Sequence, residues 1–338
     1  MKKKLYILGC LILIICLSCM GKVNYGNGVN NNLDREENNK LDQELIDDVF
    51  ADEINKDLIS DNVYELLDSY PELKKVLIEA NKKIPLMNKF IPQGITLMKD
   101  YILITGYYEK DKFSRVYILD NLGDIINTVE LDTKSHVGGI AYDAVNDLIW
   151  LPDDNGILNV YKASKFLEKK KVRKIRSFNS VGKNLIDYQD ENKNLIAYVA
   201  VDGEYLYIGN FYKTKNCFVK KYKIMFDNKV KLEYIDSFYL PKKIQGITFY
   251  EKNDKKYLIA SSSFNRRTRS NIYIYEYDES IMDYTNNLLK QIEIPPMAEQ
   301  LDIKDDKLYI IFESSASKYP NAQDKVDSIL VLDLNKIL

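Results

Sequence analysis

A strand-pair unit that recurs five times after residue 82 is the feature that most constrains the fold of this chain. In each unit a short apolar strand is followed closely by a second strand rich in Ile, Leu, Val and Tyr. The five first strands are residues 91–96, 137–142, 196–200, 244–249 and 299–303. Aligning Gln93, Gly138, Tyr198, Gln245 and Gln300 within them gives steps of 45, 60, 47 and 55 residues. Repeats of about 40–50 residues are typical of propeller blades, each of which is a four-stranded sheet.

Further strands complete these units. Each unit supplies a third strand, and four units also supply a fourth, such as residues 127–131 and 291–294. Because the last unit is one strand short, we expect residues 84–87 to complete it from the other end of the domain. The sequence thus predicts an all-β propeller of five four-stranded blades over residues 82–338, preceded by a short α-helical segment. Six blades are the alternative, because residues 165–193 are long enough for a degenerate blade.

The repeat pattern resembles the broad propeller superfamily, with NHL-like or lactonase-like blades. Gly94, Gly138, Gly139 and Gly246 fit the innermost strands, whose small residues let the strands converge on the central channel. The resemblance covers about three quarters of the chain and implies a fold rather than an activity.

The N-terminus predicts a lipoprotein signal peptide over residues 1–18. Three Lys precede an apolar run of about thirteen residues, shorter than the roughly twenty that span a bilayer, so a transmembrane helix is the weaker alternative. Leu17-Ser18-Cys19 resembles the bacterial lipobox, although Cys16 stands where Leu is common, and spirochaetal lipoproteins are similar in tolerating such boxes. We expect Cys19 to carry acyl chains such as palmitate, which anchor the protein in a membrane. Ordinary cleavage close by is the alternative.

Between the anchor and the propeller we expect a tether and a helical segment. Residues 19–40 hold hardly any apolar side chain after Cys19, so the lipidated residue is followed by a disordered tether. Residues 41–81 show apolar side chains at helical spacing. One helix is expected to begin after the cap Ser69, with an apolar face comprising Leu73, Val76, Leu77 and Ala80. We expect this helix to pack on the propeller, and docking to a partner is the alternative.

Composition narrows the function classes. Lys and Arg number 48 against 50 Asp and Glu, without the basic excess of nucleic-acid-binding proteins. The chain has one His and four Cys. Signal cleavage removes Cys10 and Cys16 and the lipid takes Cys19, which leaves Cys217 without a partner for a disulfide or a zinc site. Catalysis through a His dyad, a His-rich metal site or a nucleophile elbow has no support in the sequence.

Polar residues near the starts of the inner strands form the candidate site. We expect Gln93, His136, Gln245, Glu299 and Gln300 around one mouth of the channel, with Asp302 near them. Lactonase-like propellers, by resemblance, hold Ca²⁺ with carboxylates and amides at such positions, and Ca²⁺ takes six to eight oxygens. Only two of these residues are acidic, so we expect no metal or other cofactor. The amides then satisfy strand-end backbone groups, and a Ca²⁺ or ligand site is the alternative.

Three polar or charged loops are not expected to form a functional site. Residues 153–156 are rich in oxygen ligands but lack the rest of a Ca²⁺-binding loop, so they predict a hairpin turn. Residues 266–269 form a compact basic loop that we expect to be solvated, with contact to phosphate or lipid headgroups as the alternative. The long polar stretch 312–320 follows the last blade's second strand and specifies no reaction.

These features favour a non-catalytic, membrane-anchored protein-binding scaffold. In plan the chain is similar to the propeller lipoprotein accessory of the outer-membrane barrel-assembly machine, which binds partner loops at blade edges but has eight blades. That resemblance implies a role in outer-membrane protein assembly or envelope biogenesis, barrel-assembly subunits as partners, and the periplasmic face of the outer membrane as location. A Ca²⁺-dependent lactonase or esterase, and a surface adhesin for a host ligand, are the alternatives. No nucleic-acid partner is expected.

Overall fold

The computed structural model describes residues 55–85, 89–109, 112–154, 156–179 and 196–338. The predicted signal peptide, Cys19, the tether and the first part of the predicted helical segment lie outside these residues. Among the described residues, no helix has the length and apolar character needed to cross a membrane.

Five four-stranded antiparallel sheets make up the fold. The first is β2 (Phe90–Met98), β3 (Tyr101–Tyr108), β4 (Arg115–Leu119) and β5 (Ile125–Glu130). The second is β6 (Ala141–Asp143), β7 (Leu148–Pro152), β8 (Leu158–Lys162) and β9 (Arg176–Phe178). The third is β10 (Tyr198–Asp202), β11 (Tyr205–Gly209), β12 (Cys217–Asp227) and β13 (Lys229–Leu240). The fourth is β14 (Ile244–Lys252), β15 (Lys255–Ser262), β16 (Ser270–Glu276) and β17 (Lys290–Ile294). The fifth is β18 (Ala298–Lys304), β19 (Lys307–Phe312), β20 (Leu330–Asp333) and β1 (Leu77–Glu79).

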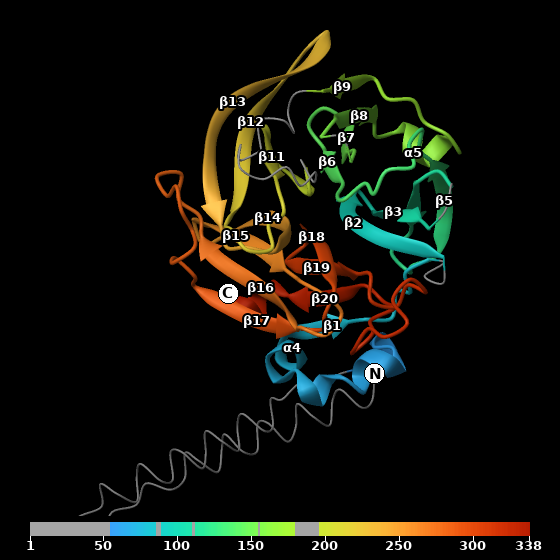
Figure 1. Ribbon diagram of the computed structural model, residues 1–338, viewed down its shortest axis with the longest axis vertical. Coiled ribbons are helices and arrows are strands. Elements are labelled where there is room, and N and C mark those ends of the chain that lie inside the picture. Colours follow the sequence, from blue (N-terminus) through green and yellow to red (C-terminus); the bar gives the residue numbers. More distant parts are fainter. Residues whose placement is uncertain (1–54, 86–88, 110–111, 155, 180–195) are drawn as a thin grey trace, which may run out of the picture. The chain divides into compact units, whose positions relative to one another are not determined.

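The five sheets are blades arranged in a ring (Figure 1). Their first strands β2, β6, β10, β14 and β18 are innermost, and each contacts the next around the ring, with β18 returning to β2. The strands follow one another in chain order in four blades. The fold is therefore a β-propeller with five four-stranded blades, as the repeat predicted.

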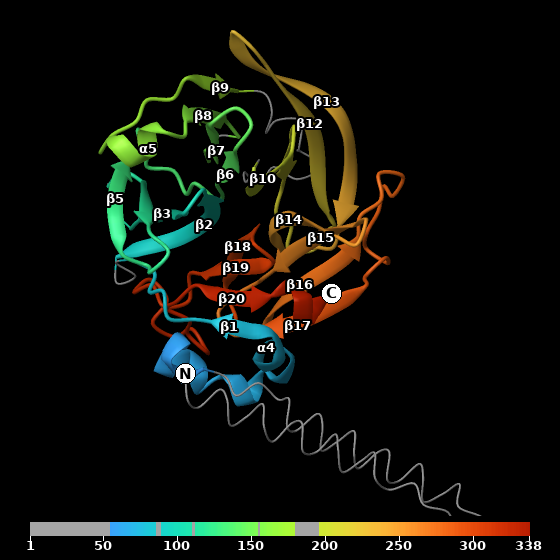
Figure 2. The same ribbon diagram turned by 180° about the vertical axis from the view of Figure 1, so that it is seen from behind.

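The strand that completes the fifth blade is not the one predicted from the sequence. β1 pairs antiparallel with β20, with Leu77 opposite Leu332 and Glu79 opposite Val331, and the two strands lie side by side in both views (Figures 1 and 2). Of the expected strand 84–87, residues 86 and 87 lie outside the described residues, and Ile84 only extends the pairing past β1: its N–H donates to Asp327 O (2.9 Å) beside an antiparallel bridge between Lys83 and Ser328. The ring thus closes seven residues earlier than expected.

Short helices precede β1: η1 (Lys56–Leu58), α3 (Asp61–Tyr64), η2 (Leu67–Ser69) and α4 (Pro71–Val76). α4 contacts β17, β20 and the C-terminal helix α6 (Leu334–Ile337), so it packs on the propeller as expected. Its predicted start and end are wrong. Tyr70 rather than Ser69 is its N-cap and makes no side-chain capping bond. Because pairing with β20 begins at Leu77, Leu77 and Ala80 are not part of its face.

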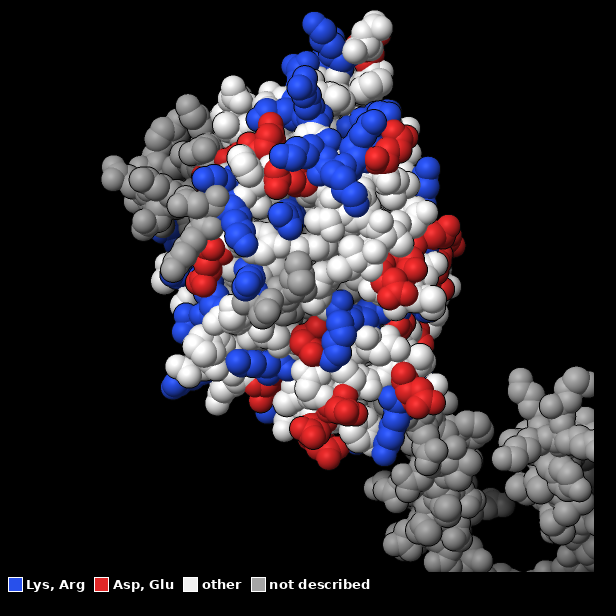
Figure 3. Space-filling model, turned by 90° about the vertical axis from the view of Figure 1, so that its right-hand side faces the viewer, with Lys and Arg blue, Asp and Glu red and all other residues white. Residues whose placement is uncertain are grey.

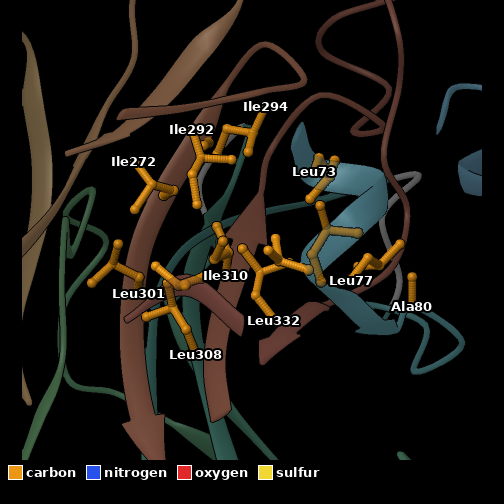
Figure 4. Close-up of a cluster of buried hydrophobic side chains, with 14 of the residues drawn as sticks. Leu73, Leu77, Ala80, Ile272, Ile292, Ile294, Leu301, Leu308, Ile310 and Leu332 are labelled. Atoms are coloured by element: carbon orange, nitrogen blue, oxygen red, sulfur yellow. The ribbon is translucent and has the colours of Figure 1, made fainter. Parts of the chain in front are cut away.

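Apolar side chains fill the space between neighbouring blades in five clusters. The largest lies between the fourth and fifth blades and includes the helical segment. Figure 4 shows Leu73 of α4 and Leu77 of β1 on one side of this cluster, with Ile292 and Ile310 of the blades opposite. Burial of such side chains is the main stabilising term of a fold of this kind.

Candidate functional site

Gln300 of β18 closes the central channel, and its side chain is only 2% exposed. Its Nε2 donates to the carbonyl oxygens of Ile140 (2.7 Å) and Val199 (2.9 Å). Its Oε1 accepts from the main-chain N–H groups of Ile95 (3.2 Å) and Ile140 (2.9 Å). Both donors and both acceptor positions of the amide are therefore used. One side chain of the fifth blade thus ties together the inner strands of the first three.

Two inner-strand glycines make room for this amide. A Cβ at Gly94 would lie 2.8 Å from Gln300 Oε1, and a Cβ at Gly246 would lie 2.8 Å from Gln300 Cα. Both distances are too short for non-bonded carbon contacts, so only glycine allows the strands to come this close. The glycines that the sequence places on the inner strands are needed for the closure of the channel.

Gln300 separates two cavities at opposite ends of the inner strands. The channel-mouth cavity, of about 270 Å³, is lined by four of the five predicted site residues: Gln93, His136, Gln245 and Glu299. Tyr107, Asp154, Phe211, Glu313, Lys318 and Tyr319 also line it. Gln300 does not, because it lines the opposite cavity of about 570 Å³ together with Asp302. Asp302 is held there by Thr96 Oγ1 and by the Leu97 N–H, each at 2.8 Å.

A pair of carboxyl groups forms the floor of the channel-mouth cavity. Glu299 of β18 hydrogen-bonds Glu313, which directly follows β19. Glu313 Oε2 also accepts from Gln93 Nε2 and from Tyr319 OH, each at 2.9 Å. Gln245 Nε2 lies 3.4 Å from Glu299 Oε1. Burial, then repulsion from Glu313, raises the pKa of Glu299 well above its usual range, and burial also raises the pKa of Glu313. Two carboxyl groups this close do not both ionise, so they share a proton.

The rim of the cavity carries its positive charge. Lys318 Nζ donates to Tyr107 OH (2.5 Å) and lies 4.9 Å from the centre of the Tyr107 ring and 5.4 Å from that of Tyr319. Its charge lowers the pKa of Glu313, against the larger effect of burial. Lys318 therefore lies within electrostatic reach of the carboxyl pair while its ammonium is held by a phenol.

His136 lies on the same rim, with its ring 4.8 Å from that of Tyr107. Its main-chain N–H donates to both carboxylate oxygens of Asp154, at 3.0 Å each. Desolvation by the surrounding protein, and then the charge of Lys318, lower the pKa of His136 to about 4. The imidazole is therefore neutral at pH 7, and no nucleophilic side chain in the described part of the chain hydrogen-bonds it.

The residues of the channel-mouth cavity do not fit Ca²⁺. Ca²⁺ takes six to eight oxygen ligands, whereas Glu299 and Glu313 share a proton and the amides of Gln93 and Gln245 point N–H donors at them. Lys318 adds a positive charge at the rim. Nowhere in the described part of the chain do three or more His, Cys, Asp or Glu side chains gather in a way that would hold a metal.

Sequence reasoning missed Glu313, Lys318 and Tyr319. They belong to the polar stretch 312–320, whose sequence has no motif that predicts a site. Turn bonds such as Ala316 N–H to Glu313 O (3.1 Å) fold this stretch back over the cavity. Asp154 likewise comes from the predicted hairpin turn, where Gly156 N–H donates to Asp153 O (3.0 Å).

Outside the channel, the third blade carries a projecting β-ribbon. β11 pairs with β12 only up to Lys223, and the β12–β13 pair continues beyond it (Figure 1). Tyr234, Ile235 and Tyr239 on β13 are 53%, 44% and 47% exposed. In the described part of the chain, no backbone group bonds the outer edge of β13 between Lys229 and Phe238. The ribbon is thus a long, partly apolar strand edge that none of the described residues covers.

A basic stretch crosses the outer side of the second blade, between the first blade and the ribbon. Residues 169–176 contain six Lys or Arg, and Lys and Arg gather on the upper part of the face that Figure 3 shows. Some are paired, such as Lys171 with Glu130 (2.6 Å). Phe178 of β9, just after the stretch, packs in the cluster that contains Val230 of β13. Residues 170–174 thus run along the first blade, where Glu130 and Asp132 face them, and only Arg176–Phe178 of β9 lie on the side of the third blade.

No protein-family model matches this sequence, and no curated protein matches it. Among solved structures, the fold is similar to Raptor from Chaetomium thermophilum, with TM-score 0.36 and 10% identity over 71% of this chain and 18% of that one. It is also similar to the β-propeller domain of Cps50 (Swd1) from Myceliophteria thermophila, with TM-score 0.39 and 12% identity over 72% and 82% of the two chains. Neither similarity is high enough to bear on function. The propeller is established by the strand pairing of the chain itself.

Proposed function

We propose that this chain is a non-catalytic, lipid-anchored protein-binding propeller of a cell envelope. Its task would be that of an accessory in outer-membrane protein assembly or envelope biogenesis, with the lipid on Cys19 holding the propeller near its partner. The observation that carries the proposal is the edge of β13, which no described residue pairs with between Lys229 and Phe238 and beside which Tyr234 and Ile235 are exposed. An extended partner segment can add to such an edge through main-chain hydrogen bonds and gain specificity from side-chain contacts.

The charge beside this edge defines the partner further. Arg176 of β9, at the end of the basic stretch, is on the side of the second blade that faces the ribbon, so we expect an extended segment that carries an acidic side chain along that side. Opposite charge steers such an encounter and fixes its register. Binding should therefore weaken as salt rises, because exposed charges are screened.

Affinity purification from detergent-solubilised envelopes tests the proposal. The wild-type chain should recover a barrel-assembly subunit or another envelope-assembly protein. Ile235→Asp, which sets a charge on the edge, should reduce recovery about tenfold, equivalent to about 1.4 kcal/mol. Val145→Asp is the matched control, because Val145 is 73% exposed and lies between β6 and β7. Equal recovery with both variants, or no envelope protein recovered by the wild type, would refute the proposal.

The anchor is tested separately by metabolic labelling with palmitate. The wild-type chain should incorporate label and sediment with membranes, and Cys19→Ala should do neither, because a chain without acyl groups loses the buried hydrocarbon that holds it. Membrane association of Cys19→Ala equal to that of the wild type would remove the lipid anchor from the proposal. Cleavage of the protein by protease added to intact cells would show that it is exposed at the cell surface, and would favour the adhesin.

A further inference from the structure

The channel-mouth cavity carries chemistry that partner binding at β13 does not use. We propose that it binds a small zwitterion of the free amino acid type, with the ligand ammonium on the Glu299–Glu313 pair and the ligand carboxylate on Lys318. This inference goes beyond the proposed function and does not depend on it.

The carboxyl pair provides the ammonium site. Glu299 is 4% exposed and Glu313 is held in place by Gln93 and Tyr319, so the two groups cannot move apart into water. A shared proton now offsets their mutual repulsion. A ligand ammonium between them would supply the same positive charge with three N–H donors and would release that proton to solvent. Tyr107, Tyr319 and Phe211 line the cavity and offer aromatic faces of the kind that attract organic cations.

Lys318 selects against a simple amine and in favour of a zwitterion. Its ammonium lies at the rim and acts on both Glu313 and His136. It would repel a ligand that carries positive charge alone, whereas a carboxylate at the other end of the ligand turns this repulsion into a charge-assisted hydrogen bond. The phenol of Tyr107 already fixes the Lys318 ammonium, which reduces the entropy lost on binding.

The dimensions of the cavity limit the ligand to a small molecule. Its volume of about 270 Å³ lies just below the roughly 300–1,000 Å³ of pockets for drug-sized ligands. Beyond the carboxyl pair, Gln300 closes the channel between this cavity and the opposite one, so a ligand can enter only from the mouth and cannot pass through the channel. The lining is polar at both ends of the proposed ligand, which suits charged termini rather than an apolar body.

Calorimetric titration of the mature full-length protein tests the proposal. The probes are the twenty common amino acids, with methylammonium, acetate, glucose and CaCl₂ as single-feature controls. We expect at least one amino acid to bind with a millimolar or lower Kd and to bind at least tenfold tighter than methylammonium or acetate. Titration in two buffers of different ionisation enthalpy should show release of about one proton per ligand, and binding should tighten as pH rises.

Three variants separate the proposed contacts. Glu313→Gln keeps the shape of the side chain and should weaken amino acid binding at least tenfold, as should Lys318→Met, which acts at the other end of the ligand. Glu251→Gln on the exposed end of β14 is the matched control and should bind like the wild type. Circular dichroism and the melting temperature confirm that each variant is folded. No binding by any amino acid, equal binding by Glu313→Gln and the wild type, or binding of glucose or CaCl₂ in their place would overturn the proposal.

Discussion

Single buried side chains connect the blades of this propeller in addition to its apolar clusters, and Gln300 is the clearest case. Replacing it with Leu keeps the volume but leaves the buried N–H groups of Ile95 and Ile140 without their acceptor. We expect Gln300→Leu to lower the free energy of unfolding by roughly 3 kcal/mol or more, since each unpaired buried group costs about 1–3 kcal/mol. Urea denaturation measures this. Gln323→Leu, at an exposed position, should change it little, and equal effects of the two would contradict the role given to Gln300.

The carboxyl pair should also make the stability of the protein depend on pH. The folded-state pKa of Glu299 is raised above its value of 4.5 in the unfolded chain, so the native state binds more protons and stability falls as pH rises through and above 4.5. Glu299→Gln removes this loss. The variant should therefore gain stability relative to the wild type as pH rises from about 5 to 8, by at most about 1.4 kcal/mol per pH unit.

Urea denaturation at four pH values in this range provides the measurement. Below pH 4.5 the wild-type carboxyl is protonated in both states, so the difference between the two proteins should be constant there. Glu251→Gln, on an exposed side chain, should follow the wild type throughout. A constant difference between Glu299→Gln and the wild type up to pH 8 would show that Glu299 is not buried beside a second carboxyl group.

The short strand β1, of three residues, closes the ring of five blades. Leu77 is 5% exposed and packs in the cluster between the fourth and fifth blades, where it lies opposite Leu332 (Figure 4). We expect Leu77→Ala to lower the free energy of unfolding by about 2–5 kcal/mol, the usual cost of such a cavity. Hydrogen exchange should then also speed up in β20. Leu122→Ala is the control, because Leu122 is 82% exposed, and an effect of Leu77→Ala no larger than that of the control would contradict closure by β1.

The parts of the fold that could be predicted from the sequence are those that recur at a regular spacing along the chain. Five blades follow from the recurring strand pairs, and Gln93, Gln245 and Glu299 share the cavity because each stands near the start of an inner strand. Residues placed by non-local pairing or by turns could not be predicted in this way. Leu77 continues a helical pattern, and only the unpaired edge of β20 makes it a strand. Glu313 reaches the cavity because a turn folds its loop back.

We propose a closed propeller that binds an envelope partner along the edge of β13, which no described residue covers. Site-specific photo-crosslinking in living cells tests this most directly, with a photoreactive amino acid at position 235 on β13 or at position 145 between β6 and β7. If the partner binds at the edge of β13, position 235 should give a discrete adduct with an envelope-assembly protein and position 145 should give none. Equal adducts from both positions, or none from position 235, would contradict it.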